Sequence, residues 1–357
     1  MTQKQPDRLC PDCEAETNWI NRREFLRTTG TIALAGVAAA SLPVWAMAAE
    51  SAKPAALDFT SKPESIVKSL FGTLSDSQKS RICFDWDFKE EKRGLLRTRV
   101  SNNWNITPPS IGSDFFTKDQ QQMIREVFEG MYQTEWIKKI DKQLKDDAGG
   151  YGKQQSIAIF GHPGIEKFEF VMTGRHLTIR CDGHSNEHVA FGGPIFYGHA
   201  ASGFNEKADH PGNVFWPQAL EANKVYKMLD ERHKKLALVE NLPLEESVGF
   251  QGPTRTYPGC PVSEFSSDQK TELQRVLSML LEPYRTSGQQ DALRCLKAQG
   301  GLDKCSLAFY REGDIGNDEV WDCWRLEGPS LVWYFRGAPH VHVWVNVADD
   351  SSIETNA

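Results

Sequence analysis

The chain has 357 residues, a formal net charge of −7, and 39% hydrophobic and 25% charged residues. This composition is typical of a globular protein, and the length suits one large domain or two ordinary ones. The net negative charge, with no basic run to offset it, argues against a protein that binds along the phosphate backbone of a nucleic acid.

The first residues resemble an export signal. Asn21 to Arg27 read Asn-Arg-Arg-Glu-Phe-Leu-Arg, which is similar to the twin-arginine consensus. The apolar segment from Ile32 to Trp45 is short for a membrane-spanning helix, and Ala46-Met47-Ala48 has the pattern of a cleavage site. We therefore predict a twin-arginine signal peptide at 1–48, use of the twin-arginine export machinery, a periplasmic or secreted location and no integral membrane segment after processing. The alternative is an N-terminal membrane anchor.

The cysteines fit that compartment. Of eight, Cys10 and Cys13 would leave with the signal peptide, and six would remain. An even number in an oxidising compartment favours disulfides. Cys295 and Cys305 flank Gly300-Gly301 and form the best predicted pair, while the pairing of the other four stays open.

The predicted elements alternate between helices and strands. Residues 49–62 are rich in Ala, Lys, Pro and Ser and are predicted to be a linker. The polar end, 348–357, is predicted to be a loose tail. Between them we predict helices at 63–71, 75–82, 117–131, 134–145, 215–238, 267–281 and 287–298, irregular stretches at 84–114 and 241–262, and strands at 155–160, 167–173, 176–181, 194–199 and from 306 onward.

Several of these segments occur twice. Ser156–Phe160 and Ser306–Tyr310 are similar strand patterns 150 residues apart, and Phe116–Gln120 resembles Phe265–Gln269 at an offset of 149. We therefore predict an α+β fold of two related lobes, 63–205 and 206–347, produced by internal duplication, each with helices followed by an antiparallel β-meander. The alternative is that helices and hairpins merely share composition.

A set of short motifs resembles one known family. In order they are Leu74-Ser-Asp-Ser-Gln78, Thr173-Gly-Arg-His-Leu-Thr178, Gly193-Pro-Ile-Phe-Tyr-Gly198, Glu327-Gly-Pro329 and His340-Val-His342. Together they resemble the bacterial family catalogued as domain of unknown function 3500, over residues 64 to 347. The resemblance implies a secreted protein but supplies no catalytic residues. It also implies an acidic residue in the strand that follows Gly328-Pro329. In this chain that strand, residues 331–335, contains no acidic residue.

The histidines are the best candidates for chemistry. His340 and His342 are two residues apart on a predicted strand, so their side chains point to the same face. Two imidazoles in this arrangement suit Cu, Zn or Fe. We expect a further ligand, His176 or His199, from the other lobe. The alternative is that these histidines are hydrogen-bonded in the sheet or face solvent.

Other polar residues have weaker claims. Arg175 could hold an anionic substrate or pair with a carboxylate. Glu206 could act as a general base and His210 as an acid or ligand, or both could belong to a solvated loop. The pair His184 and His188 has helical spacing but a loop composition.

Two functions follow from these observations. The first is an exported, His-ligated metalloprotein, an oxidoreductase or hydrolase, with its site where the lobes meet. The second is a non-catalytic periplasmic protein that binds a small ligand between the lobes through aromatics and Arg175. A structural or partner-binding protein is a third option.

Overall fold

The computed structural model describes residues 63–183, 188–199, 212–315 and 318–356. The predicted signal peptide, the linker, and the candidates Glu206 and His210 lie outside these residues. Within the described ranges, no helix has both the length and the apolarity needed to cross a membrane.

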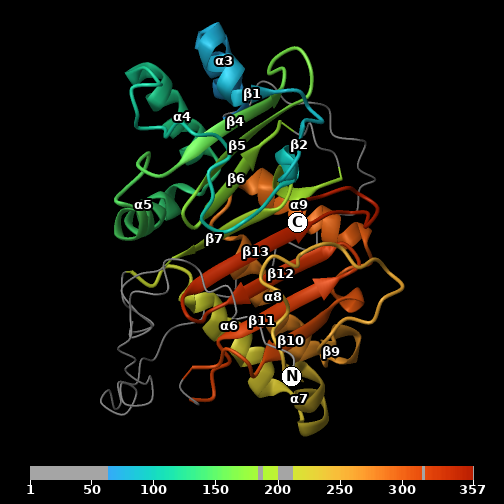
Figure 1. Ribbon diagram of the computed structural model, residues 1–357. Helices are drawn as coiled ribbons and strands as arrows, with labels where there is room; N and C mark the ends of the chain where they lie inside the picture. Colours follow the sequence, from blue (N-terminus) through green and yellow to red (C-terminus); the bar gives the residue numbers. More distant parts are fainter. Residues whose placement is uncertain (1–62, 184–187, 200–211, 316–317, 357) are drawn as a thin grey trace, which may run out of the picture.

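One large sheet runs through the molecule (Figure 1). Among the described residues it has eleven strands, in the order β1-β4-β5-β6-β7-β13-β12-β11-β10-β8, with β9 also paired to β10. Neighbours are antiparallel, except that β1 is parallel to β4 and β8 is parallel to β10. The strands are β1 (Cys83–Phe84), β4 (Ser156–Gly161), β5 (Phe168–Gly174), β6 (Leu177–Cys181), β7 (Ile195–His199), β8 (Leu238–Val239), β9 (Cys260–Pro261), β10 (Ser306–Tyr310), β11 (Cys323–Gly328), β12 (Leu331–Arg336) and β13 (Val341–Val347), with a separate pair β2 (Lys89–Glu90) and β3 (Gly94–Leu95).

Several helices follow a residue whose side chain accepts a hydrogen bond from an amide of the first turn. Thr117 before α4 and Ser266 before α8 each form a capping box with a glutamine three residues later. The helix predicted over 117–131 is therefore confirmed as α4. The helices are α2 (Glu64–Thr73), α3 (Asp76–Ile82), α4 (Lys118–Gly130), α5 (Thr134–Ala148), α6 (Trp216–Met228), α7 (Glu231–Ala237), α8 (Ser267–Leu281) and α9 (Thr286–Ala298).

Two predicted helix boundaries were wrong. The helix predicted over 215–238 is two helices, because the chain is extended at Leu229 and the Asp230 side chain caps α7 by accepting a hydrogen bond from the His233 amide. The helix predicted to end at Lys145 continues to Ala148 and ends only at Gly149, which has a left-handed backbone. This extension places Asp147 on the last turn of α5.

The two faces of the sheet are covered differently. Alternate residues of each strand, such as Val341 and Val343 of β13, pack against the helices in the main hydrophobic core. The residues between them, such as Trp344, pack against segments from the irregular stretches, including Val100 and Val248. The sheet therefore has a helix face and a loop face.

The order of elements repeats in the two halves of the chain, and the class is α+β, as predicted. From the central pair β7 and β13, the strand order reads outward as β6-β5-β4-β1 on one side and β12-β11-β10-β8 on the other. On the helix side, the Gln133 amide donates to the Pro283 carbonyl and the Arg285 amide to the Met131 carbonyl. The halves thus share one sheet and one core.

Two further expectations differ from what the structure shows. The chain end does not hang loose, since Asn356 donates hydrogen bonds to the Thr98 hydroxyl and the Leu95 carbonyl. Cys295 and Cys305 do not form the predicted disulfide. The Cys295 sulfur lies beside the His188 carbonyl oxygen, whereas the Cys305 sulfur lies beside the Gly301 carbonyl oxygen. All six cysteines of the described residues are free thiols.

Candidate metal centre

Three histidine side chains meet at one end of the central strands. The Nε2 atoms of His176, His340 and His342 lie 3.1 Å (His176 to His340), 3.0 Å (His176 to His342) and 2.8 Å (His340 to His342) apart. His176 comes from the first half of the chain and the other two from the second. This is the group that could hold a metal ion.

A glycine in the strand between them allows this approach. Gly198 of β7 pairs with His342 of β13 on one side. On the other side β6 pairs with β7 at Leu177 and Tyr197, so His176, one residue earlier, lies across from Gly198. A Cβ at Gly198 would stand 3.3 Å from Cδ2 of His176 and 2.1 Å from the Val341 carbonyl oxygen. Only glycine lets the two imidazoles meet across this strand.

His176 is held by a tight turn and a buried carboxylate. It is the second residue of the two-residue β5–β6 turn and has a φ of 50°, in the left-handed region of backbone conformation. Its Nδ1 contacts Oδ2 of Asp147, on the last turn of α5. That oxygen also accepts a hydrogen bond from the Gln143 side chain, 3.1 Å away.

His342 is held in the same way from the other half. Its Nδ1 contacts Oε1 of Glu245, in the irregular stretch that covers the loop face. The strands fix this stretch, since Arg325 donates to the Ser247 carbonyl and Asn346 to the Val248 carbonyl. Each half of the chain therefore supplies a carboxylate–imidazole pair to the same centre.

Burial sets the protonation of these groups. His176 is 1% exposed, and its burial lowers the pKa of its imidazole even though Asp147 opposes the change. Burial also lowers the pKa of His340, and the neighbouring imidazoles add to this effect. For Glu245, burial alone would raise the pKa, but the hydrogen bond to His342 and the charge of Arg336 bring it to about 2. Burial thus favours the neutral imidazole at His176 and His340, whereas Glu245 stays ionised.

The three Nε2 atoms face one another across a short gap. A carboxylate beside Nδ1 favours the tautomer with its proton on that nitrogen, so in a neutral ring Nε2 has a lone pair that can bind a metal ion. Two such atoms 3.0 Å apart repel each other unless a cation lies between them. The nitrogen ligands of a tetrahedral zinc ion lie about 3.3 Å apart, so a small expansion of the group would accommodate one ion.

The other predicted ligand, His199, lies outside this group. It follows Gly198 directly, so its side chain leaves the opposite, helix face and stacks on Phe215 at a ring distance of 6.1 Å. It is 5% exposed, its ring nitrogens have no hydrogen-bond partner among the described residues, and burial lowers its pKa to about 3. The structure brings three of the four predicted histidines together.

Arg175 lies beside the centre. Its Nε is 3.4 Å from Oδ1 of Asp147, so it pairs with the carboxylate that orients His176. Glu206 and His210 lie outside the described residues, as does His184 of the pair with helical spacing. His188 is described and contacts Asp349, which places it away from the three histidines.

Neither carboxylate was predicted from the sequence. Asp147 falls on the buried stripe of α5, four residues after Gln143 and three after Leu144, which are both buried. An acidic residue on an apolar helix stripe is a signal that could have been noticed. Glu245 lies in irregular chain, and nothing in its local sequence indicates that it reaches His342.

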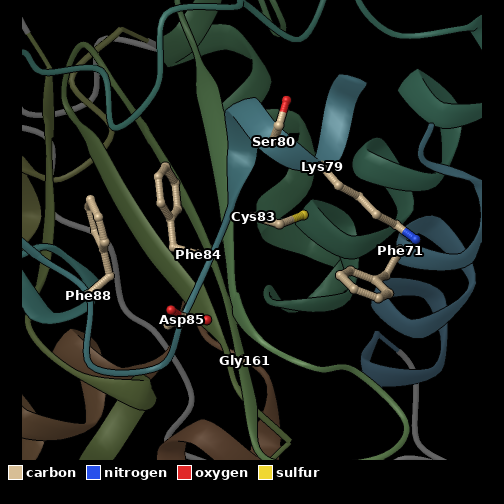
Figure 2. A pocket seen from close by; sticks show the side chains of 8 residues that line it. All are labelled: Phe71, Lys79, Ser80, Cys83, Phe84, Asp85, Phe88 and Gly161. Atoms are coloured by element: carbon tan, nitrogen blue, oxygen red, sulfur yellow. The ribbon is translucent and has the colours of Figure 1, made fainter. Parts of the chain in front are cut away.

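A second concave feature lies at the far edge of the sheet, beside β1. It is a hollow of about 400 Å³ lined by residues of α2, α3 and β1. Figure 2 shows Phe84 and Phe88 on one side of the β1 ribbon and Phe71 and Lys79 on the other, so the side chains do not converge on one point. This hollow offers less to a specific ligand than the three histidines do.

Comparison with known proteins supports one assignment. The family model described as "Protein of unknown function (DUF3500)" matches residues 59–345, which is most of the chain. No curated protein and no solved structure gives a match. The match includes all three clustered histidines and both of their carboxylates. The chain therefore belongs to the DUF3500 family.

Proposed function

We propose that this protein is a metalloprotein in which His176, His340 and His342 bind one transition-metal ion through their Nε2 atoms. The observation that carries the proposal is the convergence of these atoms at 2.8–3.1 Å with carboxylates behind two of the rings. Carboxylate–histidine pairs of this kind orient metal ligands and raise their basicity. Cu, Zn and Fe are the ions that imidazole ligands suit.

Three protein ligands leave a coordination position for water or substrate, as in catalytic rather than structural sites. A bound ion would supply either Lewis-acid or redox chemistry at that position. The chain's own part is to hold three imidazoles together, to place a carboxylate behind two of them, and to leave His340 partly exposed as the route of entry. An oxidoreductase or a hydrolase fits these features.

Metal analysis of the purified protein tests the proposal. We expect about one transition-metal ion per chain, a large loss in the double variant His340→Ala/His342→Ala, and no loss in His162→Ala. His162 is a matched control because it contacts Phe71 near the edge of the sheet. Protein that folds normally but binds no added Cu, Zn or Fe would favour the alternative, a non-catalytic protein that binds a small ligand.

We also propose that the two halves arose by internal duplication. The repeated strand order and the matching capping boxes at Thr117 and Ser266 support this. Separate profiles of residues 63–199 and 212–347, built from many family members, should align with each other at an offset near 150. Profiles that align no better than those of unrelated α+β proteins would contradict the duplication.

Export through the twin-arginine route remains a proposal of its own. It rests on the Arg22-Arg23 pair and the apolar segment after it. Replacing both arginines by lysine should leave unprocessed protein in the cytoplasm. Unchanged export of that variant would remove the proposal without affecting the metal centre.

A further inference from the structure

An arginine of β12 lies behind the carboxylate that holds His342. Arg336 and His342 are paired directly across β12 and β13, so their side chains leave the same face of the sheet. Nη1 of Arg336 lies 3.0 Å from Oε2 of Glu245, while Oε1 of Glu245 contacts Nδ1 of His342. The Glu245 carboxylate therefore bridges two neighbouring strands, with one oxygen on each.

The contact with Arg336 matters because Glu245 is weakly constrained by its own segment of chain. Glu245 lies in a turn outside the helices and strands. The last torsion of a glutamate side chain is broad, so a contact at one oxygen leaves the carboxylate able to turn. Arg336 belongs to a strand, and its guanidinium group donates in a fixed planar geometry. Contacts at both oxygens fix the plane of the carboxylate and so the orientation of the His342 ring.

The backbone beside Glu245 is held by a different residue of β12. The Tyr334 hydroxyl donates a hydrogen bond to the Pro243 carbonyl at 3.4 Å. This bond ends on a backbone oxygen two residues before Glu245, whereas Arg336 contacts the carboxylate itself. The effect of anchoring the irregular stretch and the effect of orienting the carboxylate can therefore be separated by substitution.

The first half of the chain has the same arrangement with different residues. Asp147 contacts Nδ1 of His176 through Oδ2, and its Oδ1 lies 3.4 Å from Nε of Arg175. Arg175 precedes its histidine in the sequence, whereas Arg336 reaches Glu245 from the neighbouring strand. The order of guanidinium, carboxylate and imidazole is thus built in two different ways, which favours a role for the arginine beyond local packing.

From these contacts, and resting on the proposed metal centre, we propose that Arg336 is a positioning residue of that centre, which acts on the metal ligand His342 through Glu245. Partners behind a metal ligand commonly change metal affinity about 10- to 100-fold. Glu245 can have this effect only when its carboxylate faces the imidazole. The loss of Arg336 should therefore matter only while that carboxylate is present.

A double-mutant cycle on cobalt(II) binding tests this dependence. Cobalt(II) is titrated into the purified full chain while its visible absorption is followed. We expect Arg336→Gln to weaken binding about tenfold, and Arg336→Lys to retain most of the affinity because an ammonium group can also meet Oε2 of Glu245. In a Glu245→Gln background, Arg336→Gln should weaken binding no further. Tyr334→Phe, which removes the hydrogen bond to Pro243, should bind cobalt as the wild type does.

The outcomes separate this inference from the proposal beneath it. If the wild-type protein binds no cobalt, the metal centre itself is wrong. If cobalt binds and Arg336→Gln keeps the wild-type affinity, or if its effect and that of Glu245→Gln multiply, the centre stands and the positioning role is overturned. An equal loss in Tyr334→Phe would also overturn it, in favour of anchoring of the stretch. Arg336→Met, with an apolar side chain, provides the same cycle if Arg336→Gln does not fold.

Discussion

At the scale of single residues, Asp147 provides the most specific test of how the histidines are held. In Asp147→Asn the amide can no longer fix the protonated Nδ1 of His176 as a carboxylate does. Loss of such a partner typically weakens metal binding about 10- to 100-fold, and we expect this from competition titrations. The matched control is Asp146→Asn, whose carboxylate pairs with Lys142 on the surface. Equal metal affinity in both variants would contradict the assigned role.

Glu245 allows the same test from the other half. Glu245→Gln should weaken metal binding by a similar factor, because His342 loses the acceptor for its Nδ1 proton. Glu246→Gln is the control, since that side chain accepts from the Ser101 hydroxyl instead. If only one of the two substitutions, Asp147→Asn or Glu245→Gln, weakened metal binding, the two halves would not contribute equally to the centre.

The buried thiols give a prediction about pH. Burial raises the pKa of Cys295 and Cys305 to about 12, so the reactive thiolate should be scarce near pH 8, where a free cysteine is partly ionised. Native protein should therefore react slowly with a thiol reagent at pH 8, and faster as the pH rises toward 12. Unfolded protein should show all six thiols of the described residues, and a lower number would indicate the disulfide that the sequence favoured.

What could be predicted at this scale depended on strand periodicity. The pairing of His340 with His342 followed from alternation, and that of His176 with them from the similarity between the halves. Periodicity did not place His199 correctly. A shift of one residue along a strand moves a side chain to the other face of the sheet, and the register between β7 and β13 depends on tertiary pairing. Periodicity could not identify Glu245, because irregular chain has no period.

At the scale of elements, the β7–β13 pair is the structural support of the site. Gly198→Ala would place a Cβ 2.1 Å from the Val341 carbonyl oxygen and against His176. We expect a loss of about 2 kcal/mol in the free energy of unfolding, together with weaker metal binding. Urea unfolding and metal titration measure the two effects.

A second glycine serves as the control. In Gly72→Ala the new Cβ on α2 would have no atom within 4 Å, and alanine favours a helix. That variant should be as stable as the wild type or more stable by up to about 1 kcal/mol. If both glycine variants behaved alike, close packing at Gly198 would not be what positions His176.

The elements themselves were largely predictable. Helices that begin at capping residues, such as α4, and strands of alternating apolar residues were found because their signals are local. The break at Leu229 was missed because the apolar pattern continues through it, although Asp230 is a good helix cap. The joining of the two meanders through β7 and β13 is a long-range pairing that no local signal contains.

At the scale of the whole molecule, the two halves should unfold together. They share the sheet, and a buried ion pair joins Arg285 of one half to Glu64 of the other at 2.6 Å. Arg285→Ala would leave a buried carboxylate without its cation, at a cost of about 3 kcal/mol or more. Arg311→Ala, at an exposed pair, should cost less than about 1 kcal/mol.

Cooperativity can be read from two probes. Tryptophan fluorescence and far-UV circular dichroism should give coincident urea transitions in the wild type. Two separate transitions would mean that the halves are independent units, and a centre built from both could not then be a fixed feature of the fold.

The central claim is that three imidazoles, one from the first half and two from the second, bind one ion. X-ray absorption spectroscopy of zinc-loaded protein tests this most directly, because it counts the ligands and identifies imidazole. We predict three imidazole nitrogens at about 2.0–2.1 Å, and two in His176→Ala. A first shell that contains sulfur, or one that His176→Ala leaves unchanged, would contradict the account.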